Sequence, residues 1–253
     1  MSNGQATFTW YGHSCIELKT VGGKTVLFDP WFGNPTSPRA VDDVEACDVM
    51  LVTHGHHDHL GAGPGDVLSA DALAIARRTK PVWPCIHELS LWLEKQLEGS
   101  GVEIIGMNKG GTVEAAGVKI TMVHADHSAG DWSQAGDGPL YLGEAAGFVV
   151  EMEDGRRVLH SGDTEVFGDM ALIREMYKPH MAFLPIGGHY TMGPAGAARA
   201  AQLLGVSVVV PIHYGTFPVL AGTPEQLRHG LTDRGLLGCN VIAAERGVET
   251  PLP

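Results

Sequence analysis

The sequence predicts an α/β fold in which two mixed β-sheets pack face to face with helices on their outer surfaces. Three observations indicate this class: short apolar strands come in groups, helical patterns separate the groups, and 34 glycines in 253 residues supply many tight turns. Hydrophobic residues make up 44% of the chain, which is enough for a sizeable core. We expect residues 1–253 to form a single domain, because no linker or low-complexity stretch interrupts them.

The first half of the chain is expected to build one sheet together with its covering helices. Short apolar or alternating runs predict strands, and an apolar residue at every third or fourth position predicts helices. The strands are expected at residues 8–10, 16–18, 25–29, 49–52 and 102–105, and the helices at residues 67–78 and 88–97. The division between the two sheets is expected near residues 115–117.

The second half repeats this arrangement and is expected to build the other sheet. Its strands are predicted at residues 118–123, 147–151, 158–161 and 206–213, and its helices at residues 170–177, 195–204 and 224–232. The longest irregular stretch, residues 126–143, is either a lid over a binding site or an ordinary surface loop.

Four side chains that commonly bind metal ions are crowded into the turn after the strand at residues 49–52. They lie in the run Leu51-Val-Thr-His-Gly-His-His-Asp-His-Leu-Gly61, at His54, His56, Asp58 and His59. Neutral imidazole and carboxylate groups suit zinc and similar divalent ions, and one rigid turn can direct several of them to the same point. This pattern favours a metal site, with two ions, over a group of ordinary polar residues.

Further metal-binding residue types follow three later strands. His124 ends the strand at 118–123, Asp163 follows the strand at 158–161, and His213 ends the strand at 206–213. Side chains just beyond buried strands can face a shared cleft at the edge of a sheet. His127 competes with His124 for one coordination place, and we favour His124 because it directly follows its strand.

These residues resemble the ordered ligand set of the metallo-β-lactamase superfamily. Within that superfamily, the chain is similar to stand-alone metal-dependent hydrolases related to ascorbate phosphate lactonase. The similarity rests on Phe8-Thr-Trp-Tyr-Gly-His-Ser14, His160-Ser-Gly-Asp-Thr164, Leu184-Pro-Ile-Gly187, Thr191-Met-Gly-Pro194 and Pro211-Ile-His-Tyr-Gly-Thr-Phe-Pro218. The resemblance implies the metallo-β-lactamase fold, a four-layer αββα sandwich, and it extends over nearly the whole chain.

The resemblance also implies a binuclear metal centre with assigned ligands. His54, His56 and His124 would bind the first ion, Asp58, His59 and His213 the second, and Asp163 would bridge both. Zinc is the expected ion, with manganese, iron or nickel as alternatives for the same ligands. A water held between two ions loses a proton near neutral pH, so a metal-bridging hydroxide would be the nucleophile, and Asp58 would orient it.

Three further histidines are candidates for substrate binding or proton transfer. His13 and His127 are expected to contact the substrate, although His13 has an equal claim to a structural role. His189 follows two glycines, and we expect it to be catalytic, protonating a leaving group or holding an anionic substrate. The neighbouring Tyr190, like Tyr214, is expected to be a packing residue.

The net charge of −12 argues against a protein that binds nucleic acid, because such proteins cluster Lys and Arg against phosphates. The amino-terminal residues lack the basic and apolar runs of a signal peptide or membrane span, so we expect a cytoplasmic protein that does not bind membranes. Its four cysteines have no paired spacing and are expected to be reduced core residues. A homo-oligomer is compatible with the sequence.

The leading functional hypothesis is therefore a dinuclear metal-dependent hydrolase. Its partner would be a small anionic or carbonyl-bearing substrate, and a lactone or a phosphoester fits the family resemblance best. Two alternatives are a metal-dependent binding or sensing protein without turnover and a phosphodiesterase that acts on nucleotides.

Overall fold

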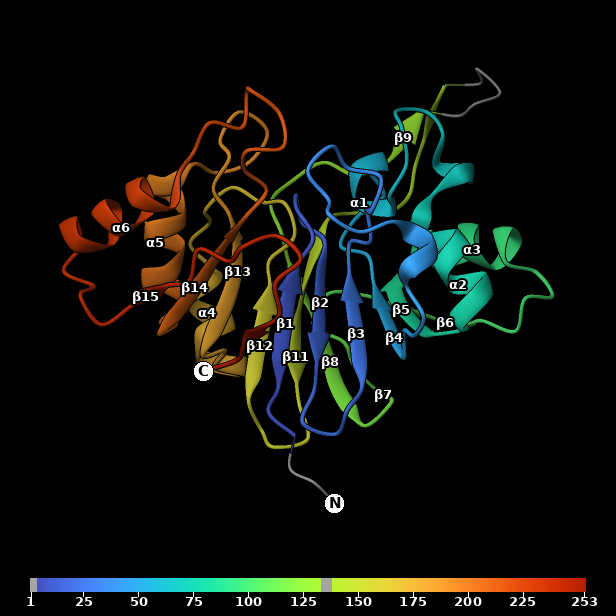
Figure 1. Cartoon of the computed structure of the whole chain (residues 1–253), viewed down its shortest axis with the longest axis horizontal. Helices are drawn as coiled ribbons and strands as arrows, with labels where there is room; N and C mark the ends of the chain where they lie inside the picture. Colours follow the sequence, from blue (N-terminus) through green and yellow to red (C-terminus); the bar gives the residue numbers. More distant parts are fainter. Residues whose placement is uncertain (1–3, 133–137) are drawn as a thin grey trace.

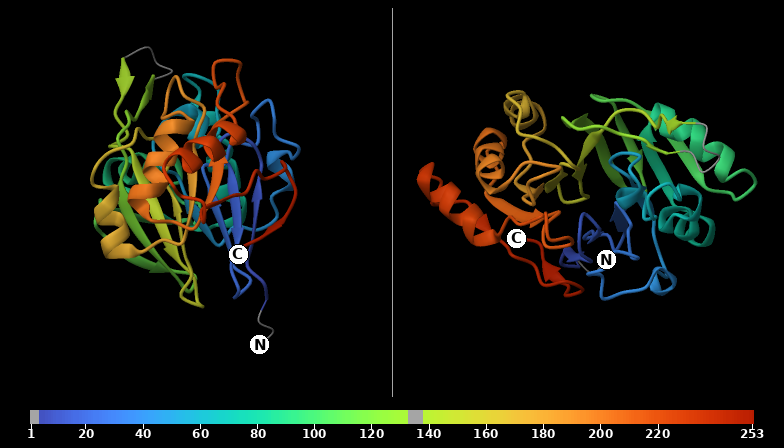
Figure 2. Two further views of the ribbon diagram at one scale, coloured as in Figure 1. Left: turned by 90° about the vertical axis from the view of Figure 1, so that its left-hand side faces the viewer. Right: turned by 90° about the horizontal axis from the view of Figure 1, so that it is seen from above.

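Two seven-stranded sheets face each other and helices cover their outer surfaces (Figure 1). The computed structural model describes residues 4–132 and 138–253. Seen from above, the sheets form the middle of the molecule and the helices lie on either side (Figure 2). The predicted fold class, a four-layer αββα sandwich of mixed sheets, is confirmed.

The first sheet contains the strands of the amino-terminal half and one strand from the carboxyl terminus. Its first four strands in space are antiparallel, and the remaining ones run parallel to their neighbours. In spatial order the strands are β16 (Thr250–Pro251), β1 (Thr7–Trp10), β2 (Ile16–Lys19), β3 (Thr25–Phe28), β4 (Val49–Leu51), β5 (Val82–Ile86) and β6 (Glu103–Met107).

The second sheet repeats the same mixture of antiparallel and parallel pairs. In spatial order its strands are β15 (Asn240–Val241), β14 (Val208–Ile212), β13 (Met181–Pro185), β12 (Arg157–His160), β11 (Ala146–Glu151), β8 (Val118–His124) and β7 (Thr112–Ala115). A separate pair, β9 (Asp131–Trp132) and β10 (Pro139–Leu140), lies beside α1 (His57–Leu60) at the upper end of the molecule (Figure 1).

Helices pack on the outer face of each sheet. On the first sheet these are α2 (Asp71–Thr79) and α3 (His87–Gln96); on the second they are α4 (Met170–Tyr177), α5 (Pro194–Leu204) and α6 (Pro224–Asp233). Short 3₁₀ helices span Val41–Asp43 and Val67–Ser69. None of the helices within the described ranges has the length and apolar character needed to cross a lipid bilayer.

The largest apolar core lies between the two sheets. Phe8 of β1 and Phe183 of β13 meet there edge to face, with ring centroids 5.3 Å apart. A smaller core joins β13 and β14 to α5 and α6. Burial on both faces holds the sheet ends in fixed positions, so loops at those ends can present side chains with little freedom. Cys15, Cys47 and Cys85 are buried, as expected.

The expected division of the chain between the two sheets is wrong at two places. β7 belongs to the second sheet because Ala116 and Gly117, both at positive φ, form a tight turn that pairs β7 with β8. The carboxyl-terminal β16 returns to the first sheet and pairs with β1.

Two individual elements also differ from the expectation. The helix expected over residues 67–78 is interrupted at Ala70, whose backbone is extended. β5 was not predicted, and it contains a proline that is atypical of strands.

Candidate metal centre

The turn between β4 and α1 presents the densest group of candidate ligands. His54 and His56 lie in the connection, while Asp58 and His59 lie on the single turn of α1. Gly61 ends the helix at φ 86°, and a Cβ atom there would lie 2.3 Å from the carbonyl oxygen of Pro30. Only glycine fits this position, so the turn has a fixed shape that holds its four side chains together.

Loops after other strands bring further ligands to the same end of the sheets. His127 follows β8, Asp163 follows β12 and His213 follows β14. His13 lies in the turn between β1 and β2. His213 and His13 are also joined directly, because the His213 backbone N–H donates to the His13 carbonyl oxygen at 2.9 Å.

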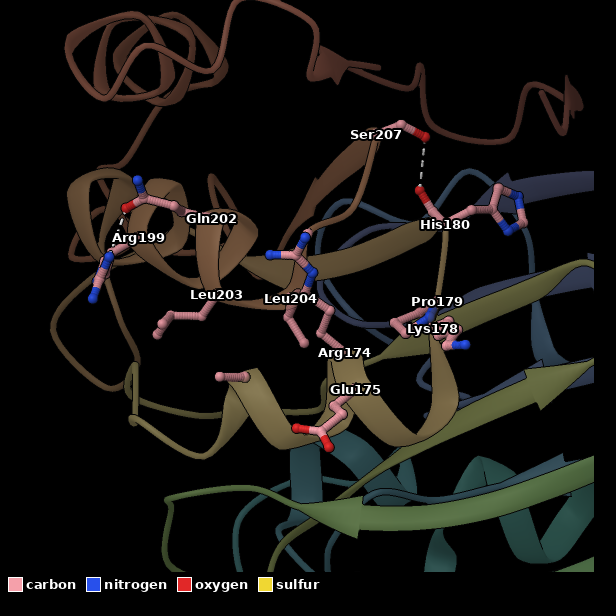
Figure 3. A pocket seen from close by; sticks show the side chains of 12 residues that line it. Arg174, Glu175, Lys178, Pro179, His180, Arg199, Gln202, Leu203, Leu204 and Ser207 are labelled. Carbon is pink, nitrogen blue, oxygen red and sulfur yellow. Dashed lines mark hydrogen bonds between the residues drawn. The ribbon is translucent and has the colours of Figure 1, made fainter.

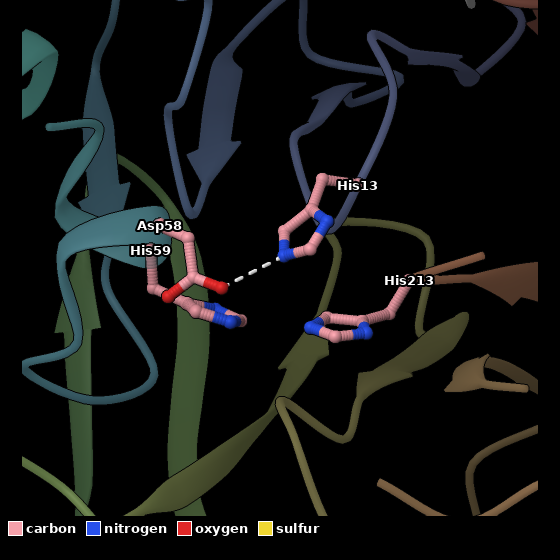
Figure 4. A group of neighbouring side chains, drawn as sticks. All are labelled: His13, Asp58, His59 and His213. Atoms are coloured by element: carbon pink, nitrogen blue, oxygen red, sulfur yellow. Dashed lines mark hydrogen bonds and ion pairs between the residues drawn. The ribbon is translucent and has the colours of Figure 1, made fainter. Parts of the chain in front are cut away.

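The structure brings eight of these side chains together in three overlapping groups. Within each group the potential ligand atoms lie within 4.8 Å of one another, close enough to share an ion. Figure 4 shows how Asp58 and His59, both on α1, converge with His13 and His213 from other segments. The groups are His54, His56 and His127; His13, Asp58, His59 and His213; and His54, His59 and Asp163. We call these eight residues the histidine–aspartate cluster.

Asp163 occupies the middle of the cluster. Its Oδ2 lies 2.9 Å from His213 Nε2 and 3.3 Å from His59 Nε2. Its other oxygen, Oδ1, is buried and has no hydrogen-bond partner among the described residues, and the same is true of His213 Nδ1. A buried carboxylate oxygen without a partner is costly, whereas a cation beside it would satisfy it. The residues present therefore fit divalent ions.

Most histidines of the cluster are neutral near pH 7, which is the form that binds metal. Burial, together with neighbouring histidines, lowers the pKa of His13 and of His56 to about 4. Burial also lowers the pKa of His54 and of His127. The cluster therefore holds a set of unprotonated ring nitrogens beside its carboxylates.

In contrast, the surroundings of His59, Asp58 and Asp163 favour the charged form of each side chain. Burial would lower the pKa of His59, but Asp163, Asp29 and Asp58 together raise it well above its usual value. Burial likewise disfavours the ionised carboxylates, yet the nearby histidines hold the pKa values of Asp58 and Asp163 well below the usual range. Both carboxylates are thus ionised, and a cation in the cluster would replace the proton on His59.

The structure places His127, and not His124, beside His54 and His56. His124 ends β8 with an exposed side chain that lies 3.3 Å from Lys109 Nζ and packs against Phe167. The His127 ring lies 5.1 Å from the His54 ring and 5.2 Å from the His56 ring. The preference for His124 as the third ligand therefore does not match this arrangement, because the loop after β8 turns back towards Asp163.

His13 belongs to the cluster as well as to the cleft, where it was expected to contact substrate. Its Nε2 lies 3.0 Å from Asp58 Oδ2 and its Nδ1 lies 3.0 Å from Thr216 Oγ1. Because Asp58 is ionised and His13 is neutral, Nε2–H donates to the carboxylate and Nδ1 accepts from the threonine hydroxyl. Both ring nitrogens are therefore engaged, and His13 orients Asp58.

Asp29 supports the cluster and was missed by the sequence analysis. It is fully buried at the end of β3 and accepts from the Thr53 backbone N–H at 2.7 Å and the Thr53 hydroxyl at 2.9 Å. Its Oδ2 also lies 2.8 Å from His59 Nδ1, so it fixes the ring with Nε2 towards Asp163. The available signal was an aspartate directly after a buried strand and before a proline.

Three residues of this region adopt the left-handed backbone conformation that non-glycine residues seldom occupy. His13, Asp29 and His213 have φ values of 49°, 42° and 52°. Such positions cost on the order of 1 kcal/mol or more each and persist where the surrounding structure fixes them. Their occurrence around one cluster is typical of a functional site.

A cleft of about 890 Å³ opens onto the cluster. Six members of the cluster line it: His13, His56, Asp58, His127, Asp163 and His213. The remainder of the lining is largely apolar and comes from four separate segments of the chain. We call six of these residues the apolar wall: Pro64, Leu140, Tyr141, Tyr190, Phe217 and Val219.

His189 is not among the residues that line this cleft, contrary to the expectation that it is catalytic. Gly188 and His189 both have positive φ, and this sharp turn leads the chain to Tyr190. Tyr190, expected to be a packing residue, is 62% exposed and lines the cleft. The structure thus places Tyr190, rather than His189, at the cleft, while the His189 side chain is exposed beside it.

A second hollow, of about 880 Å³, lies between α4 and α5 (Figure 3). It carries Arg174, Lys178 and Arg199. Its Ser207 precedes β14, whereas His213 follows β14. The two hollows thus lie at opposite ends of the same strand, and positive charge gathers at the one without the cluster.

Comparison with known families gives a match over most of the chain. Residues 24–214 match the model of the beta-lactamase superfamily domain.

Curated relatives and solved structures agree with this match. The chain is 44% identical over 221 residues to a UPF0173 metal-dependent hydrolase of Koribacter versatilis, covering 87% of this chain and 88% of the relative. It is also 44% identical over 229 residues to such a hydrolase of Archaeoglobus fulgidus, covering 90% and 91%. Igni18, a metallo hydrolase of Ignicoccus hospitalis, is similar in structure, with a TM-score of 0.81, 33% identity and 99% of each chain covered.

Proposed function

The chain belongs to the beta-lactamase superfamily and is a metal-dependent hydrolase, and we propose that its histidine–aspartate cluster holds two divalent ions. His54, His56 and His127 would hold the first ion. Asp58, His59 and His213 would hold the second, and Asp163 would lie between them. Imidazole nitrogens with carboxylates suit zinc, and manganese, iron or nickel could use the same ligands.

One observation carries this proposal. Asp163 has one buried oxygen in contact with two histidine rings and the other with no hydrogen-bond partner in the described parts of the chain. Ions held beside Asp163 would give its partnerless oxygen a counter-charge, and the flanking histidines would each have an ion to bind. The partnerless Nδ1 of His213 and the neutral state of His54 and His56 fit the same arrangement.

We propose that the protein hydrolyses a small substrate with an ester-type bond. Bound divalent ions would polarise the reacting carbonyl or phosphoryl oxygen and bring the pKa of a bound water to about 7. Asp58 would accept a hydrogen bond from the attacking water, since its carboxylate is ionised and lines the cleft. His13 would hold that carboxylate in place through Nε2, and the apolar wall would exclude bulk water.

The proposal is tested with protein reconstituted with zinc or manganese and a panel containing a lactone, a carboxylic ester, a phosphomonoester and a phosphodiester. Asp163→Asn, treated identically, is the blank that corrects for hydrolysis by free metal. Turnover by the wild type, reduced at least roughly 100-fold in the variant, is expected because the variant loses a central charged contact. A wild type that binds two ions but turns over no compound above the blank would contradict hydrolysis of ester-type bonds and favour a sensing role.

A further inference from the structure

The cleft that opens onto the cluster has an unusual concentration of exposed apolar side chains. Tyr141 is 65% exposed, Tyr190 62%, Val219 48% and Phe217 40%. Large apolar groups that gather around a hollow commonly mark a binding surface, because covering them releases the water that they order. A ligand with an apolar surface would gain from contact with this wall.

The wall begins directly beside the cluster. The Phe217 ring lies 6.2 Å from the His13 ring and 6.2 Å from the Trp31 ring. Leu140 and Tyr141 approach from β10 and the residue after it, and Tyr190 comes from the loop after β13. A bond held at the cluster would therefore have apolar side chains next to it on several sides.

No lysine or arginine lines the cleft among the described residues. Proteins recognise phosphate groups with arginine, lysine or helix N-termini. The lysine near His124, Lys109, pairs with Glu144 at 2.7 Å and is not part of the lining. The cations Arg174, Lys178 and Arg199 gather in the other hollow, at the opposite end of β14 (Figure 3).

Carboxylates at the cleft add to the difference in charge between the two hollows. Asp58, Asp163 and Asp131 line it, and Asp131 Oδ2 lies 3.6 Å from His57 Nδ1. Ions in the cluster could neutralise a negative charge only on the group that reacts there. Away from the cluster, a second anionic group on the substrate would meet mostly apolar side chains, with Asp131, His57 and Ser128 as the polar ones, and no lysine or arginine of the described lining would offset its lost hydration.

We propose that this cleft selects lactones and esters whose non-reacting part is uncharged and apolar, an alkyl chain or an aryl ring, and rejects phosphorylated ones. This proposal rests on the hydrolase function proposed above. In the reaction, water adds to the carbonyl carbon, the bond from that carbon to the ring oxygen breaks, and the ring oxygen takes a proton. The product is a hydroxy acid with all atoms of the lactone and one water.

The first test compares γ-butyrolactone, γ-octalactone and γ-decalactone with 6-phosphogluconolactone, using zinc-loaded protein and the Asp163→Asn blank. Burying a methylene is worth roughly 0.8 kcal/mol, so kcat/KM is expected to rise about threefold to fourfold for each methylene that reaches the wall. The phosphorylated lactone is expected to be the poorest substrate. Equal or faster turnover of 6-phosphogluconolactone than of γ-decalactone would overturn the proposal.

Variants of the wall distinguish a binding role from a structural one. Phe217→Ala and Tyr190→Ala are expected to raise KM for γ-decalactone more than for γ-butyrolactone, so the ratio of their kcat/KM values falls severalfold. Leu237→Ala is the matched control, because Leu237 is an 80% exposed apolar residue outside the cleft. Loss of activity on both lactones by the same factor would mean that these residues act only through the fold.

A binding measurement separates failure of this proposal from failure of the hydrolase function. If no lactone is turned over above the blank, the hydrolase proposal fails for this bond, and calorimetric titration of the same zinc-loaded protein decides the selectivity. Tighter binding of γ-decalactone than of 6-phosphogluconolactone would support an apolar cleft. The reverse order, or no binding of γ-decalactone, would overturn it.

Discussion

The histidine–aspartate cluster and the apolar wall face the same cleft but are built in different ways. The cluster is largely buried, its side chains bond to one another, and His13 and His213 adopt strained backbone conformations. The wall is largely exposed, and its residues come from loops except for Leu140, which ends β10. In the function proposed above, the buried cluster would supply the chemistry of the site, and the exposed wall would select the substrates that enter.

Acidification is expected to affect the cluster more than any other change. In ion-free protein, His13 and His56 have pKa values of about 4, whereas an unfolded histidine titrates near 6.5. The unfolded state therefore binds more protons as the pH falls below about 6.5, and the folded state loses stability. His59, whose pKa is raised, acts in the opposite direction and offsets part of this loss.

We therefore expect the free energy of unfolding of chelator-treated protein to fall by roughly 2 kcal/mol or more between pH 7 and pH 5. Urea unfolding at both pH values measures it. His56→Gln should show a smaller fall than the wild type, because glutamine does not titrate. A stability that is constant or rises between pH 7 and pH 5 would show that the cluster histidines are not held neutral.

Removal of His127 is expected to have the next largest effect. His127→Ala should lower the bound metal by one ion and reduce kcat/KM on the order of 100-fold, because the lost ion would no longer stabilise charge in the transition state. His124→Ala is the matched control and should resemble the wild type, since His124 faces Lys109 and Phe167. Elemental analysis and initial rates measure both quantities. A variant pair with the opposite ranking would restore His124 as the ligand.

Asp29→Asn tests whether the buried carboxylate next to His59 contributes to metal binding. The variant loses the charge that fixes His59, and metal affinity is expected to fall about 10- to 100-fold. Asp48→Asn is the control, because Asp48 also accepts a backbone N–H, from Thr25, but lies at the other end of β3. Competition with a chromogenic chelator gives the affinities. An equal loss in both variants would indicate a general effect on the sheet.

The apolar wall is expected to contribute least to stability. Tyr141→Ser should change the free energy of unfolding by no more than about 0.5 kcal/mol, because the side chain is 65% exposed. Phe148→Ala, in the core between the sheets, should cost about 3 to 5 kcal/mol in the same urea experiment. A loss above about 1 kcal/mol in Tyr141→Ser would assign this wall residue to packing and weaken the contrast with the cluster.

The same contrast explains what could be predicted from the sequence. The cluster could be predicted because four of its members, His54, His56, Asp58 and His59, lie within six residues of the chain. So many histidines and aspartates in one turn have few structural explanations. The sheets could be predicted from apolar runs. The wall could not be predicted, since Leu140, Tyr190 and Phe217 are far apart in the sequence and only the folded chain brings them together.

The choice between His124 and His127 depends on contacts that no local pattern contains. The Asp126 backbone N–H donates to the Thr164 hydroxyl at 2.9 Å, and the Glu165 N–H donates to the Asp126 carbonyl at 3.1 Å. These bonds attach the loop after β8 to the loop after β12 and bring His127 to Asp163. His124 remains on the strand, where its side chain is exposed.

The number of ions bound to each chain tests the proposed binuclear centre. Wild-type protein is loaded with zinc, desalted and analysed by inductively coupled plasma mass spectrometry against a measured protein concentration, with His127→Ala beside it. We expect two ions per wild-type chain and one per variant chain. One ion or none in the wild type would contradict a binuclear centre built on Asp163.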